Sequence, residues 1–139
     1  VKAGADVVVL DGMQGGTAAT QEVFIENVGQ PTLACIRPAV QALQELGMHR
    51  KVQLIVSGGI RNGADVAKAL ALGARSTYIG RAFIYGLGAM GQAGVTKALE
   101  VIHKELDVTM ALCGERSVAA LGRHNLIVPQ GFEDLTTPL

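Results

Sequence analysis

The stretch KVQLIVSGGIRNGADVAKALALGARSTYIGR, residues 51–81, decides the fold of this chain. Its first part, Val52–Val56, is a short and nearly continuous apolar run, which is typical of a parallel strand buried on both faces. A small polar turn, Ser57–Gly59, follows this strand at once, and Asn62–Gly73 carries the start and stop signals of a helix. Ser76–Ile79 is a second short strand, so the stretch predicts a βαβ unit.

Each of these two strands is followed by a turn that carries glycine and arginine. Glycine permits backbone conformations closed to other residues, and backbone N–H groups, a helix N-terminus and a guanidinium together suit an anion. Adjacent parallel strands place both turns at the same edge of the sheet, and in (β/α)8 barrels the last two turns at that edge often hold a phosphate. The alternative is an ordinary strand–helix connection that binds nothing. The residues expected to bind the anion are Ser57, Gly58, Gly59, Arg61, Gly80 and Arg81.

A further strand is expected near the start of the chain, at Ala5–Leu10, where the residues are apolar, β-branched and predicted to be buried. The Gly-rich loop that follows would lie at the carboxyl end of a parallel strand, where α/β enzymes keep their ligands. The alternative is a solvent-exposed connection. We expect this loop to bind a substrate through Asp11, Gln14, Gly15, Gly16 and Thr17.

Helical patterns fill most of the remaining chain, with a loop expected at Gly86–Gly88. The pattern around residue 100 places Val95, Leu99, Ile102 and Leu106 at helical spacing, which predicts one buried face. From Pro129 onward the sequence is typical of a tail or linker, residues 129–139. The expected helices are Gln21–Val28, Thr32–Leu46 with Pro38 near its start, Gly91–Leu106, one beginning at Asp107, and a short one from Ser117 to Gly122.

The composition excludes several classes of protein. The 139 residues are 49% hydrophobic, and 12 basic residues balance 12 acidic ones, so we expect neither a nucleic-acid partner nor binding to a charged membrane surface. No apolar run approaches the length of a membrane span, and no signal-peptide pattern is present, so a cytoplasmic protein is expected. Cys35 and Cys113 fit no metal-binding spacing, and we expect buried thiols and no metal, with a disulfide as the alternative.

The order of elements predicts an α/β fold with three parallel strands. Three strands are too few to bury both faces and both edges of a sheet. The chain also begins without Met and reaches a strand almost immediately, so we expect a fragment of a longer protein. Residues 1–128 would need the remaining strands from elsewhere, and a homo-oligomer is expected.

Several motifs resemble one family of flavoenzymes. The segments SGGIRNGADVAKALALGA, GRAFIYGL and GQAGVTKALEVIHKELDVTMALCGERSV are similar to the C-terminal part of the FMN-dependent α-hydroxy-acid oxidases and dehydrogenases, over about Gln53–Leu126. This resemblance implies a (β/α)8 TIM barrel of which residues 1–128 are the last three βα units. It also implies FMN as cofactor, with its phosphate at the two glycine-containing turns, and lactate- or glycolate-type oxidation of a 2-hydroxy acid.

Two departures from that family concern the site. The family usually has Asp where this chain has Ser57, which weakens ribityl contacts but leaves the backbone donors in place. The family also carries a catalytic His, closely followed by a substrate-binding Arg, on the loop that corresponds to Leu10–Thr17, and neither residue is present here. The catalytic base is therefore unknown, and weak or absent oxidation of 2-hydroxy acids is expected.

The front half resembles a second branch of the same fold. DGMQGGTAATQEVFIENVGQPT is similar to the flavin domain of glutamate synthase and its relatives, which bind FMN and act through 2-iminoglutarate. The cysteine cluster that holds iron and sulfur in some of those proteins is absent from this chain. Three functions remain open: a 2-hydroxy-acid oxidoreductase, a glutamate-synthase-like domain acting on 2-oxoglutarate or 2-iminoglutarate, and a non-catalytic flavin-binding half-barrel.

Overall fold

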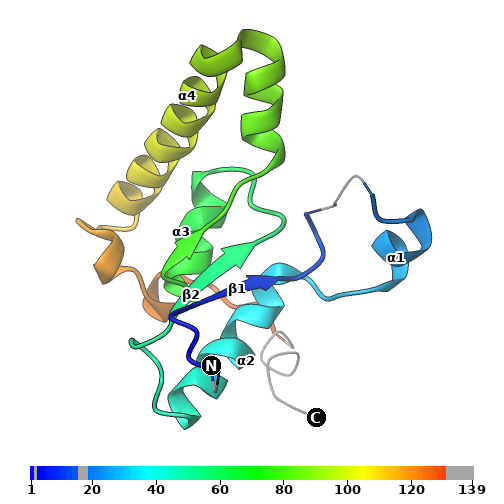
Figure 1. Ribbon diagram of the computed structural model, residues 1–139. Helices are drawn as coiled ribbons and strands as arrows, with labels where there is room; N and C mark the ends of the chain where they lie inside the picture. Colours follow the sequence, from blue (N-terminus) through cyan, green and yellow to red (C-terminus); the bar gives the residue numbers. More distant parts are fainter. Residues whose placement is uncertain (2, 16–18, 131–139) are drawn as a thin grey trace.

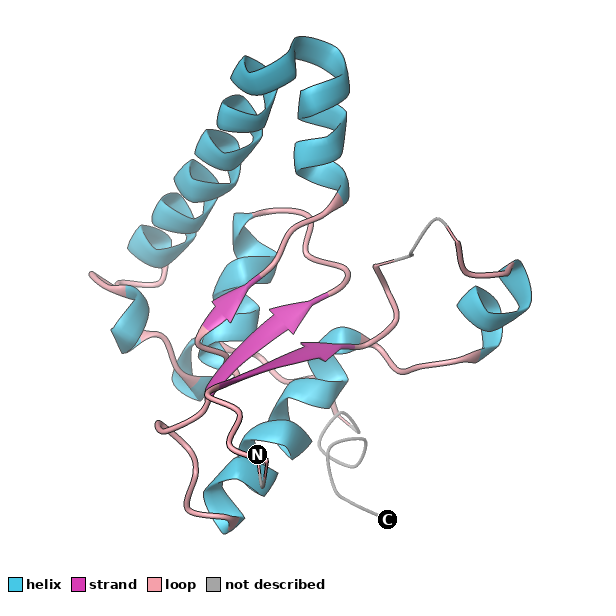
Figure 2. Ribbon diagram, in the orientation of Figure 1, coloured by secondary structure: helices cyan, strands magenta, loops and turns pink. Residues whose placement is uncertain are grey.

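Three parallel strands form the centre of the protein. The computed structural model describes residues 1, 3–15 and 19–130. Strands β1 (Val7–Asp11), β2 (Gln53–Ser57) and β3 (Ser76–Thr77) pair in the order β1-β2-β3 (Figures 1 and 2). Each neighbouring pair is parallel, so all three strands end at the same edge. The predicted α/β class is therefore confirmed, although β3 is shorter than the expected strand at Ser76–Ile79.

Each strand is followed by helix, as in repeated βα units. The loop after β1 leads to α1 (Glu22–Asn27) and α2 (Thr32–Glu45), β2 leads to α3 (Gly63–Ala71), and β3 leads to α4 (Arg81–Leu112). Pro38 lies inside α2 without ending it. In place of the short helix expected from Ser117 to Gly122, the chain forms two 3₁₀ turns, Val118–Ala120 and Arg123–Asn125.

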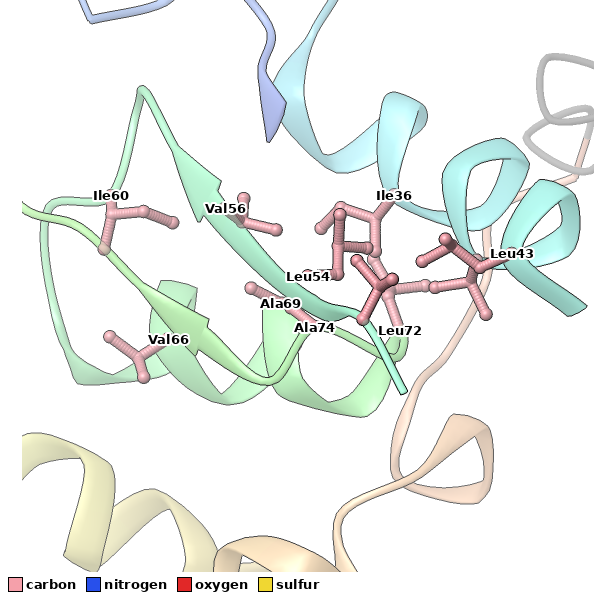
Figure 3. Close-up of a cluster of buried hydrophobic side chains, with 11 residues drawn as sticks. Ile36, Leu43, Leu54, Val56, Ile60, Val66, Ala69, Leu72 and Ala74 are labelled. Atoms are coloured by element: carbon pink, nitrogen blue, oxygen red, sulfur yellow. The ribbon is translucent and has the colours of Figure 1, made fainter. Parts of the chain in front are cut away.

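The hydrophobic core lies between the sheet and the helices α2 and α3. Leu54 and Val56 of β2 are 4% and 0% exposed, and they face Ile36 of α2, Ala69 of α3 and Leu72, which follows α3 (Figure 3). Burying a side chain of this size is worth about 1.5–3 kcal/mol. Strand β2 is therefore the element that joins the two helices into one layer.

The opposite face of the sheet has no covering layer in the described part of the chain. Val7 and Val9 of β1 are each 48% exposed, whereas Val8 and Leu10 pack against the core. The prediction that the strand at Ala5–Leu10 is buried is thus wrong for Val7 and Val9. The reason is that α2 and α3 lie against one face only, which leaves alternate side chains of β1 without a partner.

Helix α4 is a helical hairpin instead of the expected loop and two separate helices. The expected loop at Gly86–Gly88 is helical, and the helix continues through Asp107 to Leu112. The break falls at Met90 and Gly91, where φ of Gly91 is 59° and ψ is −139°. The two halves then lie side by side (Figure 1) because Gly86 and Gly94 let their backbones touch. Small residues in this segment therefore permit close packing and do not mark a loop.

The apolar stripe on the second half of α4 is only partly buried. Ile102 and Leu106 pack against the core, but Leu99 is 52% exposed. The predicted core face thus holds for the end of the helix nearer to α3. The part nearer the bend projects beyond the sheet and lies beside the first half of α4 (Figure 2).

The segment after α4 is held by a carboxylate. Glu115 accepts a hydrogen bond from Asn125 Nδ2 at 2.9 Å, and His124 Nε2 lies 2.8 Å from the same oxygen. The Asn125 bond, followed by the His124 contact, lowers the pKa of Glu115 from its ordinary value of 4.5. The two 3₁₀ turns are thereby tied to the end of α4.

The contact between Gly86 and Gly94 gives a stability prediction. In the full-length protein, Gly94→Ala is expected to lower the free energy of unfolding by about 1–3 kcal/mol, because the added methyl group would overlap the Gly86 carbonyl. Gly88→Ala is the matched control, since a methyl group there meets open space and Ala favours helix by about 0.5–1 kcal/mol. Chemical denaturation measures both. Equal effects of the two substitutions would contradict the close approach.

Candidate functional site

A small cavity lies at the carboxyl ends of the strands, where the turns after β2 and β3 meet the start of the loop after β1. Its volume is about 160 Å³. The loop after β1 contributes Asp11 and Gly15 to it, and the remaining lining residues are Ser57, Gly58, Gly59, Ile60, Tyr78, Ile79, Gly80 and Arg81. The two glycine-containing turns predicted from the sequence therefore meet at one place.

The turn after β2 owes its shape to two glycines in the left-handed region of backbone conformation. The φ values of Gly58 and Gly59 are +91° and +75°. A Cβ atom on Gly58 would lie 2.8 Å from Asp11 Oδ1, and one on Gly59 would lie 3.1 Å from Gln14 Oε1. The turn thus depends on glycine both for its conformation and for the close approach of the loop after β1.

Backbone donors at this turn and at the start of α4 remain available to a ligand. The N–H groups of Gly59 and Ile60 donate no hydrogen bond to another described residue. The first hydrogen bond of α4 runs from Ile84 N–H to the Gly80 carbonyl, so the N–H groups of residues 81–83 have no acceptor within the helix. Gly80 and Arg81 line the cavity, which places this positive helix end beside it.

Arg81 is the cationic side chain of the cavity. Its Nη2 donates a hydrogen bond of 2.9 Å to the backbone carbonyl of Gln14. That contact joins residues 67 positions apart in the chain. A guanidinium has five N–H donors, so the remaining ones can serve an anion in the cavity.

Arg61, the second arginine predicted for the site, does not line the cavity. Its side chain is 74% exposed, and its Nε lies 3.0 Å from Oδ2 of Asp65 on α3. The hydrogen bond to Asp65 and the charge of that carboxylate raise the pKa of Arg61. Asp65 lies in the first turn of α3, and the sequence pattern does not show that its carboxylate takes the Arg61 side chain.

The loop after β1 is organised by its own polar groups. Asp11 Oδ1 accepts a hydrogen bond from Met13 N–H at 2.8 Å, and Gly15 approaches Gly58 closely enough that a Cβ on Gly15 would lie 3.5 Å from the Gly58 Cα. Gln14 Oε1 accepts from Thr32 N–H at 2.7 Å. Gly16 and Thr17, the other two residues predicted to bind substrate, lie outside the described residues.

Thr32 is a supporting residue of the site, although the sequence pattern marks it only as the start of the helix expected at Thr32–Leu46. The structure places it in the first turn of α2, after Pro31, with 1% of its surface exposed. Its hydroxyl lies 3.5 Å from the Ser57 carbonyl, and its N–H donates to Gln14. The sequence signal was the Pro-Thr pair at a helix start, but the partners across the fold are not visible in it.

The described part of the chain lacks the residues for several other kinds of site. The residues that line the cavity include no histidine. Histidine, cysteine, aspartate and glutamate side chains form no group of three or more that would hold a metal ion. Cys35 is half-buried and Cys113 exposed, contrary to the expectation of two buried thiols, and neither forms a disulfide. No described helix has the length and apolar character needed to cross a membrane.

Residues 17–128 match the family of FMN-dependent dehydrogenases, so the chain belongs to this family of oxidoreductases. Among similar proteins, a glutamate synthase large subunit-like protein of Rhizobium meliloti (strain 1021) is 83% identical over 88 residues, which are 63% of this chain and 20% of that protein. A peroxisomal (S)-2-hydroxy-acid oxidase of Oryza sativa subsp. japonica is 40% identical over 119 residues, which are 84% of this chain and 32% of the oxidase.

Solved structures of the same class share the fold. A mutant flavocytochrome b2 with pyruvate bound superposes with a TM-score of 0.80 at 28% identity, over 99% of this chain and 33% of that one. A mandelate oxidase mutant with a monooxide FMN adduct gives 0.70 at 33% identity, over 88% of this chain and 35% of that one. The chain thus spans about a third or less of the relatives described here.

FMN is the cofactor of this family, and the residues of the cavity suit one part of it. A phosphate needs hydrogen-bond donors and positive charge, which the free N–H groups of the glycine turn, the start of α4 and Arg81 provide. The cavity is smaller than the roughly 300–1,000 Å³ of sites for drug-sized ligands. The lining present in this chain can therefore accommodate a phosphate group.

The close approach at Gly58 can be tested by substitution. In the full-length protein, Gly58→Ala is expected to lower the free energy of unfolding by about 1–3 kcal/mol more than Gly114→Ala does. Both residues have positive φ, +91° and +76°, but a Cβ on Gly114 meets nothing within 4 Å. Urea denaturation of the two variants separates crowding by Asp11 from backbone strain. If both substitutions cost the same, the loop does not pack on this turn as described.

Proposed function

We propose that residues 1–128 are the last three βα units of a (β/α)8 barrel and that 129–139 form a tail or linker. The order β1-β2-β3, with every neighbouring pair parallel and each strand followed by helix, supports this arrangement. The open face of the sheet supports it as well, because Val7 and Val9 point there and would be buried by the layers of a closed barrel. Residues outside this chain complete the sheet.

The FMN phosphate is proposed to occupy the cavity between the turns after β2 and β3. The observation that carries this assignment is the meeting of Gly58–Ile60 with Gly80 and Arg81 around one small space lined by N–H donors and a guanidinium. In (β/α)8 barrels the loops after the last two strands frequently form a phosphate site. Ser57 and Gly58 would adjoin the ribityl chain. Arg61 would contribute only by leaving its ion pair with Asp65.

The chemistry follows from this placement. Bound FMN supplies the hydride transfer, and the protein supplies binding, orientation and electrostatics. The loop after β1 lies beside the phosphate turns, so Asp11 and Gly15 would border the substrate side of the site. None of the described lining residues is a histidine, and we propose that this loop binds substrate while the catalytic base comes from residues outside the chain.

The proposed substrate is a small 2-hydroxy or 2-oxo acid. Similarity to a hydroxy-acid oxidase over 84% of the chain supports a lactate- or glycolate-type reaction. Two observations favour a glutamate-synthase-like reaction on 2-oxoglutarate or 2-iminoglutarate: the 83% identity to a glutamate synthase large subunit-like protein, and the absence of histidine from the described cavity lining. We give this second candidate the greater weight, since identity is highest there.

A cytoplasmic homo-oligomer is the proposed state of the full-length protein. The thiols of Cys35 and Cys113 are unpaired, as is usual in a reducing compartment. Exposed apolar side chains on the first half of α4, including Ile84 at 52% and Leu87 at 50%, support association with further protein surface.

The phosphate assignment predicts a difference between two flavins. Arg81→Ala is expected to weaken binding of FMN to the full-length apoprotein by about 10- to 150-fold, the usual worth of hydrogen bonds to a charged group. Binding of riboflavin, which lacks the phosphate, should change little. Arg61→Ala is the comparison variant and should have the smaller effect, because its side chain pairs with Asp65. Flavin fluorescence titration measures both affinities for the wild type and for each variant. An unchanged FMN affinity of Arg81→Ala would refute the assignment.

The two substrate candidates predict different reduction of the flavin. Anaerobic mixing of the full-length holoenzyme with lactate or glycolate is expected to bleach the flavin slowly or not at all. 2-Oxoglutarate is expected to bind and to perturb the flavin spectrum, and Gln14→Ala together with Thr17→Ala should weaken that binding. Rapid bleaching by lactate would instead establish the hydroxy-acid reaction. A protein that binds FMN but responds to none of these acids would be a non-catalytic flavin-binding module.

A further inference from the structure

Gln14 contacts three separate parts of the site, although it was expected only to face a substrate. Its side-chain oxygen accepts from Thr32 N–H at 2.7 Å, and its backbone carbonyl accepts from Arg81 Nη2 at 2.9 Å. A Cβ on Gly59 would lie 3.1 Å from Gln14 Oε1 and 3.3 Å from Gln14 Cβ, so the side chain also packs against the glycine turn. One residue thereby joins the loop after β1, the start of α2, the turn after β2 and the start of α4.

The bond to Thr32 replaces a missing helix cap. The N-cap residue of α2 is Pro31, whose side chain makes no capping bond. The first N–H groups of a helix need acceptors from outside it, and Gln14 provides one from another element. Thr32 is 1% exposed, and its hydroxyl reaches the Ser57 carbonyl, so this anchor is fixed relative to β2. The loop after β1 is held at residue 14 by a rigid partner.

The same anchor fixes the acceptor that Arg81 uses. Thr32 binds the side-chain oxygen of Gln14, and Arg81 binds the backbone carbonyl of the same residue. Arginine has many rotamers, and holding its guanidinium in one place costs entropy unless a partner orients it. The cavity-lining Arg81 has this partner at 2.9 Å. Loss of the Thr32 bond would release the loop and with it the acceptor.

We propose that Gln14 is a positioning residue, which orients Arg81 toward the cofactor phosphate by anchoring its own carbonyl to the N-terminus of α2. The proposal rests on the proposed function, since it takes the phosphate of FMN as the anion in the cavity. It assigns Gln14 no contact with the reacting atoms. The residue acts through Arg81 and contributes to the preference for a phosphorylated flavin.

The test compares FMN with riboflavin in the full-length apoprotein. Gln14→Met keeps a side chain of similar length but removes the acceptor for Thr32 N–H. It is expected to lower the FMN-to-riboflavin affinity ratio by about tenfold, since Arg81 loses its fixed orientation and its hydrogen bond to the phosphate joins charged groups. Gln30→Met is the matched control: Gln30 lies just before α2, and among the described residues its side chain pairs with Cys35 and not with the cavity lining, so the ratio should stay unchanged.

A double-mutant cycle that combines Gln14→Met with Arg81→Met tests whether Gln14 acts through Arg81. If Gln14 acts through Arg81, Gln14→Met should not lower the ratio further once Arg81 is replaced. Additive losses would overturn the proposal, as would equal weakening of FMN and riboflavin by Gln14→Met, which indicates general loosening. An unchanged ratio in Gln14→Met would overturn it too. A wild-type protein without any preference for FMN over riboflavin would refute the proposed function itself, before any variant is compared.

Discussion

The parallel pairing of β1 with β2 is the constraint on which the site depends. Its register sets Asp11 opposite Ser57, so the two strands end level with each other. The loop after β1 and the glycine turn after β2 therefore begin side by side, and β3 brings Gly80 and Arg81 to the same edge. Two neighbouring parallel strands must be joined by a crossover connection. Here the crossovers contain α2 and α3, the helices that cover Leu54 and Val56 of β2. Ligand site and core are thus consequences of one pairing pattern.

Glycine residues also let the backbones of different elements approach each other closely at several places. Gly58 lies against Asp11 and Thr32, and Gly63 at the start of α3 lies against Leu106 and Glu105 of α4. The Gly63 N–H also donates to Glu105 Oε2 at 2.9 Å, so packing and hydrogen bonding fix the same contact. With 18 glycines in 139 residues, the chain uses these small residues where elements must touch. The high glycine content thus serves the interior as well as the turns.

Arg61 and Arg81 differ in their partners, and this difference decides which positive charge is available to a ligand. Arg61 is held by Asp65, which is itself 5% exposed and whose N–H donates to the side chain of Asn62, the N-cap residue of α3. Arg81 instead rests on a neutral carbonyl, which leaves its positive charge uncompensated by any described carboxylate partner. An anion in the cavity would meet this second guanidinium first. The position of each cation relative to an acidic residue, and not its place after a glycine turn, sets its availability.

The sequence by itself determined the α/β class, the βαβ unit at 51–81 and the meeting of two glycine turns at one edge. These follow from short-range physics: apolar runs, helix caps and glycine at positive φ are readable from neighbouring residues. Family membership was likewise carried by local motifs. Only the tertiary structure decided that Gly86 and Gly94 pack two helices together, that Arg61 turns to Asp65, and that Gln14 connects Thr32 with Arg81. The two Gln14 contacts depend on where elements distant in the chain come to lie, which no local pattern encodes. The Gly86–Gly94 contact depends on the bend at Met90 and Gly91, and the Arg61–Asp65 pair, although only four residues apart, depends on the direction that each side chain takes at the start of α3.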